Sequence, residues 1–144
     1  TPTPVPTEPV VTTAQITNFK VEPQDGNLLI SFDYSGKASA YNAFQIFVDS
    51  DNSAATGYQV GGIGAEFMLE NAGLFSYAGN GSSWEWQAVT PAVVSFSAVE
   101  PTASWRVSRV DLKLDKAKVA AFVAQLVNVN WDAVANARLV VEFK

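Results

Sequence analysis

The fold class follows from one stretch of sequence, Leu28-Leu29-Ile30-Ser31-Phe32-Asp33-Tyr34. Every second residue in it is apolar or aromatic, and the residues between include a serine and an aspartate. Successive side chains of an extended chain point to opposite faces, so this period of two places one set in a core and the other toward solvent. The stretch therefore predicts a β-strand with one buried face.

The same alternation recurs along most of the chain. Residues 44–48 and 94–98 repeat it, and further strands are expected at 15–21, 64–70, 73–77, 84–89, 104–110 and 137–143. Turn-forming residues such as Asp25-Gly26 and Gly79-Asn80-Gly81 separate these segments. Short strands at this spacing are typical of an antiparallel sandwich. We therefore expect an all-β fold, mainly an antiparallel β-sandwich of the jelly-roll or immunoglobulin-like kind.

One segment near the C-terminus shows a helical period instead. Its apolar side chains recur at intervals of three and four residues, at Val119, Phe122, Val123, Leu126 and Val127. Such a stripe is typical of an amphipathic helix, and Asp115 and Asn128 are suited to cap its two ends. We therefore predict one short amphipathic helix that lies across the sandwich.

The N-terminal segment differs in composition from the rest. Its first ten residues contain four of the seven prolines and three threonines. Such a sequence favours an extended, polyproline-like spacer, because proline fixes φ and cannot join a hydrogen-bonded ladder. We interpret residues 1–13 as a Thr/Pro-rich interdomain linker and 14–144 as one β-sandwich module. Thr/Pro linkers typically join extracellular modules, so a secreted or cell-surface parent protein is expected.

The composition of the 144 residues excludes several functions. The net charge of −5 offers no basic surface for nucleic acid, and no apolar run approaches the ~20 residues of a membrane-spanning helix. Cysteine and histidine are both absent, so Ser-His-Asp and Cys-His nucleophiles cannot form. Carboxylate chemistry is the main catalytic option that remains. The composition therefore favours binding over catalysis.

An acidic loop follows the strand predicted at 44–48. Asp49, Asp51 and Asn52 supply the hard oxygen ligands that calcium prefers. An EF-hand is excluded, because Ala54 stands where that loop needs glycine and Val60 where it needs glutamate. Two interpretations stay open, a structural calcium site and a loop whose side chains only cap turns.

Two glutamates share one face of the strand predicted at 64–70. Glu66 and Glu70 could form the carboxylate pair of a glycosidase. They could equally lie on a solvated face, or supply further calcium ligands beside the acidic loop. We favour these two alternatives over catalysis.

A hairpin over residues 74–87 carries the aromatic residues that could bind a ligand. Alternation places Trp84 and Trp86 on one face, with Tyr77 on the opposite arm and Glu85 and Asn80 nearby. Indole faces stack on the apolar faces of sugar rings, and polar neighbours can bond the hydroxyl groups. The alternative is that the tryptophans fill the core. We expect at least one of the pair to be exposed.

The other two tryptophans are harder to place from sequence. Trp105 alternates with Val107 and is expected in the core. Trp131 follows the predicted helix and could either seal the end of the sandwich or join a surface site.

Taken together, four segments resemble the family 9 carbohydrate-binding modules and the wider DOMON-like superfamily. They are the acidic loop within residues 47–58, the strand 64–70, the aromatic hairpin 74–86 and the late strand 105–112. Ser108 departs from the pattern, since proline is usual at that position. The resemblance implies a β-sandwich accessory module, often with structural calcium, which Asp49 and Asp51 would ligate. It also implies that Trp84 and Trp86, with Tyr77, form the sugar platform.

The leading hypothesis is a non-catalytic carbohydrate-binding module of a larger secreted protein. Its partners would be a polysaccharide or oligosaccharide and a catalytic domain in the same chain, with no nucleic acid and no membrane insertion. A structural or adhesive sandwich that docks or spaces other proteins is the alternative. A small glycoside hydrolase using Glu66, Glu70 or Glu85 ranks third, because a compact sandwich rarely offers a deep catalytic cleft.

Overall fold

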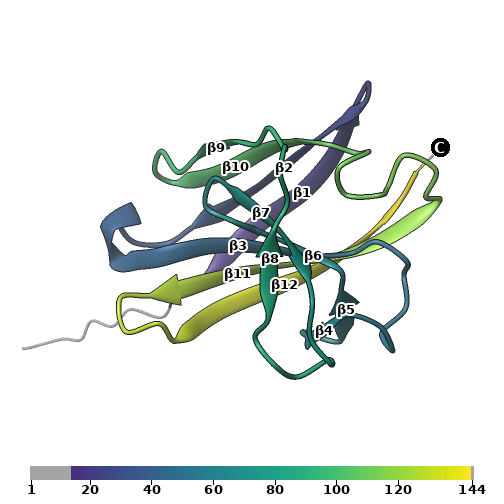
Figure 1. Cartoon of the computed structure of the whole chain (residues 1–144). Helices are drawn as coiled ribbons and strands as arrows, with labels where there is room; N and C mark the ends of the chain where they lie inside the picture. Colours follow the sequence, from purple (N-terminus) through teal and green to yellow (C-terminus); the bar gives the residue numbers. More distant parts are fainter. Residues whose placement is uncertain (1–13, 144) are drawn as a thin grey trace, which may run out of the picture.

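The computed structural model describes residues 14–143 as an all-β chain built from antiparallel sheets (Figure 1). The four-stranded sheet has the order β1 (Ile16–Gln24), β2 (Asn27–Tyr34), β10 (Thr102–Ser108), β9 (Ser95–Ser97). The six-stranded sheet has the order β12 (Ala133–Glu142), β11 (Val119–Asn128), β3 (Tyr41–Asp49), β6 (Phe67–Glu70), β7 (Gly73–Tyr77), β8 (Trp86–Ala88). A small ribbon pairs β4 (Tyr58–Val60) with β5 (Ile63–Ala65), and a 3₁₀ turn spans Ala38–Ala40.

These sheets confirm the all-β, antiparallel prediction. The linker predicted at 1–13 lies outside the described residues. No helix in the described part of the chain is long and apolar enough to cross a membrane.

The core lies between the inner faces of the four- and six-stranded sheets. The alternating apolar residues of β2 are fully or almost fully buried there, namely Leu28, Ile30, Phe32 and Tyr34. It meets inward-facing side chains of β3, β6 and β11 from the opposite sheet. Trp105 is buried in this core as predicted, and its indole N–H donates a 2.8 Å hydrogen bond to the carbonyl of Asn71. The bond satisfies the one polar atom that burial of an indole would otherwise leave unpaired.

The helix predicted near the C-terminus is wrong, because that segment is the strand β11. It pairs antiparallel with β12 on one side and with β3 on the other. Phe122 packs in the core between the sheets, whereas its neighbour Val123 packs on the opposite face. A strand buried on both faces loses its alternation, so a short apolar run cannot be told from a buried helix by period alone.

The outer face of the six-stranded sheet carries a second, smaller apolar cluster. Phe47, Met68 and Val123 point outward there and are covered by Ile63 and Ala65 of the β4–β5 ribbon. The ribbon covers only part of this face, and the part beyond it holds the polar residues described below. The single strand predicted at 64–70 is accordingly broken at Glu66, where β5 of the ribbon ends and β6 of the sheet begins.

A core truncation tests the assignment of Phe122 on β11 to the core. Phe122→Ala should lower the free energy of unfolding by about 3–5 kcal/mol, because a fully buried ring is replaced by a cavity. Val140→Ala on β12 is the control, since a side chain 50% exposed should change stability by only about 0.5 kcal/mol. Urea denaturation followed by tryptophan fluorescence measures both. A loss below about 1 kcal/mol for Phe122→Ala would contradict the assignment.

Candidate functional site

Three carboxylates converge at one end of the outer face. Asp49 ends β3, Asp51 lies in the turn that follows, and Glu66 lies between β5 and β6. One oxygen from each carboxylate falls within 4.8 Å of the other two. Asp49 is 2% exposed because β3 is central in the sheet. Asn52, also predicted as a ligand, is exposed in the same turn with a φ of 51°.

Neighbouring backbone and hydroxyl groups hold the three carboxylates in place. Glu66 Oε1 accepts a 2.8 Å hydrogen bond from the Ser50 N–H, and Asp49 Oδ1 accepts one of 3.1 Å from the Ser53 N–H. The Thr56 hydroxyl lies within hydrogen-bond distance of both Asp51 Oδ2 and Glu66 Oε2. These contacts join the acidic turn to the segment that leads into β4.

Proximity and burial shift the titration of the group. Burial raises the pKa of Asp49 to about 6, and its shared hydrogen bond with Asp51 adds to the rise. Burial also raises the pKa of Glu66 to about 7, with a further contribution from the charges of Asp51 and Asp49. Burial opposes ionisation of Asp51 too, but hydrogen bonds from Thr56 and others lower its pKa. Ionising all three groups at neutral pH therefore costs free energy unless a cation is present.

Two backbone carbonyls extend the oxygen-rich surroundings of these carboxylates. A Cβ added to Gly64 would overlap the carbonyl oxygens of both Ser53 and Thr56, and the Gly64 N–H lies 3.4 Å from Asp49 Oδ2. Carbonyls and carboxylates together are the hard donor set that calcium prefers. The acidic triad of Asp49, Asp51 and Glu66 could therefore hold a metal ion of this class.

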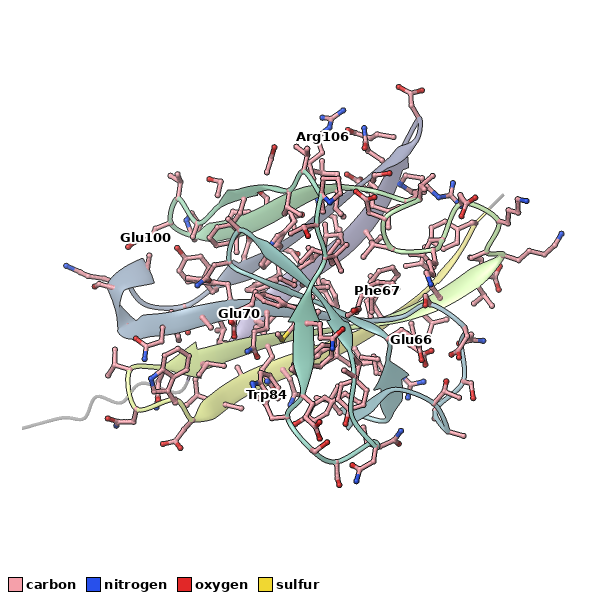
Figure 2. All side chains as sticks on the ribbon, viewed as in Figure 1. Glu66, Phe67, Glu70, Trp84, Glu100 and Arg106 are labelled. Atoms are coloured by element: carbon pink, nitrogen blue, oxygen red, sulfur yellow. The ribbon has the colours of Figure 1, made fainter. Side chains whose placement is uncertain are left out.

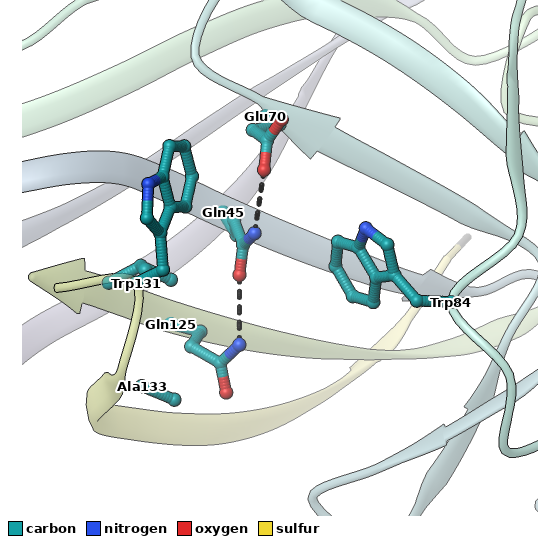
Figure 3. A pocket seen from close by; sticks show the side chains of 7 residues that line it. Gln45, Glu70, Trp84, Gln125, Trp131 and Ala133 are labelled. Atoms are coloured by element: carbon teal, nitrogen blue, oxygen red, sulfur yellow. Dashed lines mark hydrogen bonds between the residues drawn. The ribbon is translucent and has the colours of Figure 1, made fainter.

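A pocket of about 470 Å³ opens further along the same outer face (Figure 3). Its lining is formed by Gln45, Glu70, Trp84, Gln125, Val127, Trp131 and Ala133. The side chains of Trp84 and Trp131 lie on opposite sides of it, and they are 54% and 67% exposed. Large exposed indoles on the two sides of one pocket are suited to binding a flat ligand between them.

A row of polar side chains crosses the floor of this pocket. Gln45 on β3 is in register with Glu70 on β6 and with Gln125 on β11. Gln45 Nε2 donates a 2.8 Å hydrogen bond to Glu70 Oε2, and Gln125 Nε2 donates one of 2.8 Å to Gln45 Oε1. The bonds align three side chains from three neighbouring strands, and Gln45 itself is buried.

Trp131 occupies its position at a conformational cost. It lies in the β11–β12 hairpin with a φ of 65°, in the left-handed region that bulky residues rarely adopt. The side-chain oxygen of Asn128 accepts hydrogen bonds of 2.9 and 3.0 Å from the N–H groups of Asn130 and Asp132, which fixes the turn. An exposed aromatic residue in this strained region is a candidate for a functional role.

Trp84 packs against other aromatic rings. Its ring lies edge-on to Tyr58 at 5.3 Å between centroids, and to Trp86 at 5.7 Å. A 2.8 Å hydrogen bond from the Gln59 N–H to the Gly81 carbonyl ties β4 to the loop that carries Trp84. Because Tyr58 follows Thr56 and Gly57, the acidic triad and the wall of the pocket are connected through one short segment.

Of the five residues predicted to bind a ligand, Trp84 lines the pocket. Trp86 packs against Phe47 and Tyr58, and its buried indole N–H has no hydrogen-bond partner among the described residues. The Tyr77 hydroxyl donates to the Ser83 carbonyl at 2.7 Å and accepts from the Gly81 N–H at 2.8 Å, which holds the loop together.

The two polar candidates of that hairpin lie outside the pocket's lining. The Asn80 side-chain oxygen accepts hydrogen bonds of 3.3 Å from the N–H groups of Ser82 and Ser83, so it caps the loop. Glu85 is exposed and immediately precedes β8. Neither residue is part of the pocket that Trp84 lines.

Sequence reasoning missed the residues that complete the pocket. Gln45 and Gln125 are single polar residues inside otherwise apolar segments, which is the one sequence signal that could have identified them. Glu66 precedes β6 and Glu70 ends it, and they belong to the acidic triad and to the pocket floor respectively (Figure 2).

Comparison of the chain with protein-family models, with curated proteins and with solved structures finds no match. The acidic triad and the pocket are therefore the features of this chain that indicate a function.

Replacing Trp131 by glycine tests whether the indole contributes to stability. Trp131→Gly relieves the left-handed φ and removes a side chain that is mostly exposed. The free energy of unfolding should therefore differ from the wild-type value by no more than about 1 kcal/mol, and an increase would reflect the relief of strain. Thermal and urea denaturation measure it. A loss of more than about 2 kcal/mol would show instead that the indole stabilises the fold.

Proposed function

We propose that this chain is a non-catalytic carbohydrate-binding module, and that the pocket between Trp84 and Trp131 is its binding site. The observation that carries the proposal is the pair of exposed indoles on opposite sides of a hydrogen-bonded polar floor. The sugar platform of this proposal is Trp84 with Trp131, in place of the pair of Trp84 with Trp86 expected from the sequence.

Sugar rings have the properties that such a pocket requires. Their faces carry C–H groups that pack on indole rings, and their edges carry hydroxyl groups that both donate and accept hydrogen bonds. Gln45, Glu70 and Gln125 offer amide N–H groups and acceptor oxygens to those edges. The pocket volume of about 470 Å³ is within the usual range for a small-molecule site. A site of this kind supports affinities of roughly micromolar to millimolar Kd.

The acidic triad completes the proposal as a structural calcium site. Asp49, Asp51 and Glu66 would hold the ion, with the carbonyls of Ser53 and Thr56 close by. Bound calcium would supply the positive charge that lets all three carboxylates ionise at neutral pH. Because Thr56 leads directly to Tyr58, which packs against Trp84, the ion would also steady one wall of the sugar site.

The wider biological setting remains part of the proposal. The Thr/Pro-rich composition of residues 1–13 supports a tether between this module and a catalytic domain in a secreted parent protein. Binding to a polysaccharide would then raise the effective concentration of that domain at its substrate. Two facing sheets with a shared core support a sandwich of the jelly-roll or immunoglobulin-like kind.

Truncating the indoles tests the sugar site. Trp84→Ala and Trp131→Ala should each weaken binding by about tenfold or more, because each removes one stacking face from the ligand. Affinity electrophoresis against a panel of soluble glucans, xylans, mannans and galactans measures the effect.

The matched control is Val129→Ala, an exposed residue of the Trp131 hairpin that does not line the pocket. It should bind as the wild type does. If the folded wild-type protein is retarded by no glycan of the panel, the proposed function is wrong and a protein-docking role becomes the better hypothesis.

The triad predicts a dependence of stability on pH that calcium removes. With chelator present, Asp49 and Glu66 have folded-state pKa values of about 6 and 7, above the ordinary values near 4. The folded state then binds more protons than the unfolded state, so stability should fall as pH rises from about 5 to about 8. The lowered pKa of Asp51 has the opposite sign, but it acts only below about pH 4.

Calcium should raise Tm most at the alkaline end of this range, where all three carboxylates are ionised. Saturating calcium at 100 times its Kd would add about 2.7 kcal/mol of stability. Differential scanning fluorimetry measures both series. Asp51→Asn should abolish the calcium effect, whereas Asp115→Asn, an exposed carboxylate outside the triad, should retain it. Identical melting curves with calcium and with chelator would exclude the metal site.

A further inference from the structure

The pocket contains one ionisable side chain, and that side chain is acidic. Among its lining residues Glu70 is the single charged group, and the others are two glutamines, two tryptophans, a valine and an alanine. Arg138 lies on β12 in register with Val123, beside Gly62 in the β4–β5 turn, and it does not line the pocket. A ligand in the pocket therefore meets a negative charge with no cation in the lining to offset it.

Glu70 also sets the hydrogen-bonding pattern of the floor. A carboxylate only accepts hydrogen bonds, so it orients the Gln45 amide with its nitrogen toward Glu70 Oε2. The Gln45 oxygen then points to Gln125 and accepts its N–H. The remaining oxygens of the row, Glu70 Oε1 and Gln125 Oε1, are acceptors to which the hydroxyl groups of a ligand can donate.

On the basis of the proposed function, we propose that the pocket selects uncharged, hydroxyl-rich sugars and rejects sugars that carry a carboxylate, with Glu70 as the specificity-determining residue. A sugar hydroxyl can donate to Glu70, whereas an ionised carboxylate has no hydrogen to donate. It would also bring a second negative charge into a partly enclosed site, where like charges repel more strongly than in water. Rejection therefore has two causes, unpaired acceptors and charge repulsion.

Matched neutral and acidic ligands test this selectivity. The probes are mixed-linkage glucan oligosaccharides and the same oligosaccharides oxidised at C6, together with galacturonan oligosaccharides and their methyl esters. Titrations followed by tryptophan fluorescence, with calorimetry as the second readout, give the Kd values. The wild-type protein should bind the neutral member of each pair that it recognises at least about tenfold more tightly.

The role of Glu70 is tested by removing its charge at nearly constant shape. Glu70→Gln should reduce the preference for the neutral member to about threefold or less, while affinity for the neutral sugar changes by a smaller factor. Glu85→Gln removes the same charge from an exposed position outside the pocket, so it should leave the preference unchanged. Circular dichroism and Tm check that both variants are folded.

The outcomes separate this inference from the proposed function. Equal or tighter binding of the acidic member by the wild-type protein would overturn the inference and leave the sugar site standing. The inference also fails if Glu70→Gln and Glu85→Gln change the preference equally, because a long-range effect of net charge would then explain it. Absence of binding to every neutral and acidic probe would overturn both proposals.

Discussion

Burial of β3 and β11 on both faces is the constraint on which the rest of the structure depends. These two central strands pack one set of side chains into the core between the sheets and the other set into the outer cluster. The β4–β5 ribbon must cover the outer set, because exposed phenylalanine and valine side chains would cost the free energy of apolar hydration. The ribbon thereby fixes Tyr58, and through it the loop that carries Trp84.

The polar groups of the outer face lie beside this apolar cluster, and two of them are buried. Asp49 and Gln45 are the buried polar residues of the described chain, and both belong to β3. Asp49 meets two other carboxylates at one end of the strand, and Gln45 joins Glu70 and Gln125 further along it. Buried polar groups are costly unless they are paired, and both residues are paired here, Gln45 with Glu70 and Gln125 and Asp49 with the N–H of Ser53.

The two candidate sites form one continuous arrangement. The acidic triad binds the segment leading to β4 through Thr56, and β4 is bonded to the loop of Trp84 through Gln59 and Gly81. The second wall, Trp131, is held independently by the Asn128 turn of the opposite hairpin. The wall formed by Trp84 is thus linked to the triad. The wall formed by Trp131 depends on the local backbone of its hairpin, where Trp131 has a strained, positive φ.

The sequence by itself determined the all-β class, the buried face of β2, the burial of Trp105 and the acidic turn at Asp49 and Asp51, because alternation and turn chemistry are local properties. It could not determine β11, since burial on both faces removes the period that distinguishes a strand from a helix. Only the tertiary structure brought Glu66 to the acidic turn and set Trp131 opposite Trp84 across the Gln45 row. Those residues come from loops and strands far apart in the chain, and the pairing of the strands, which no local pattern encodes, decides which of them meet.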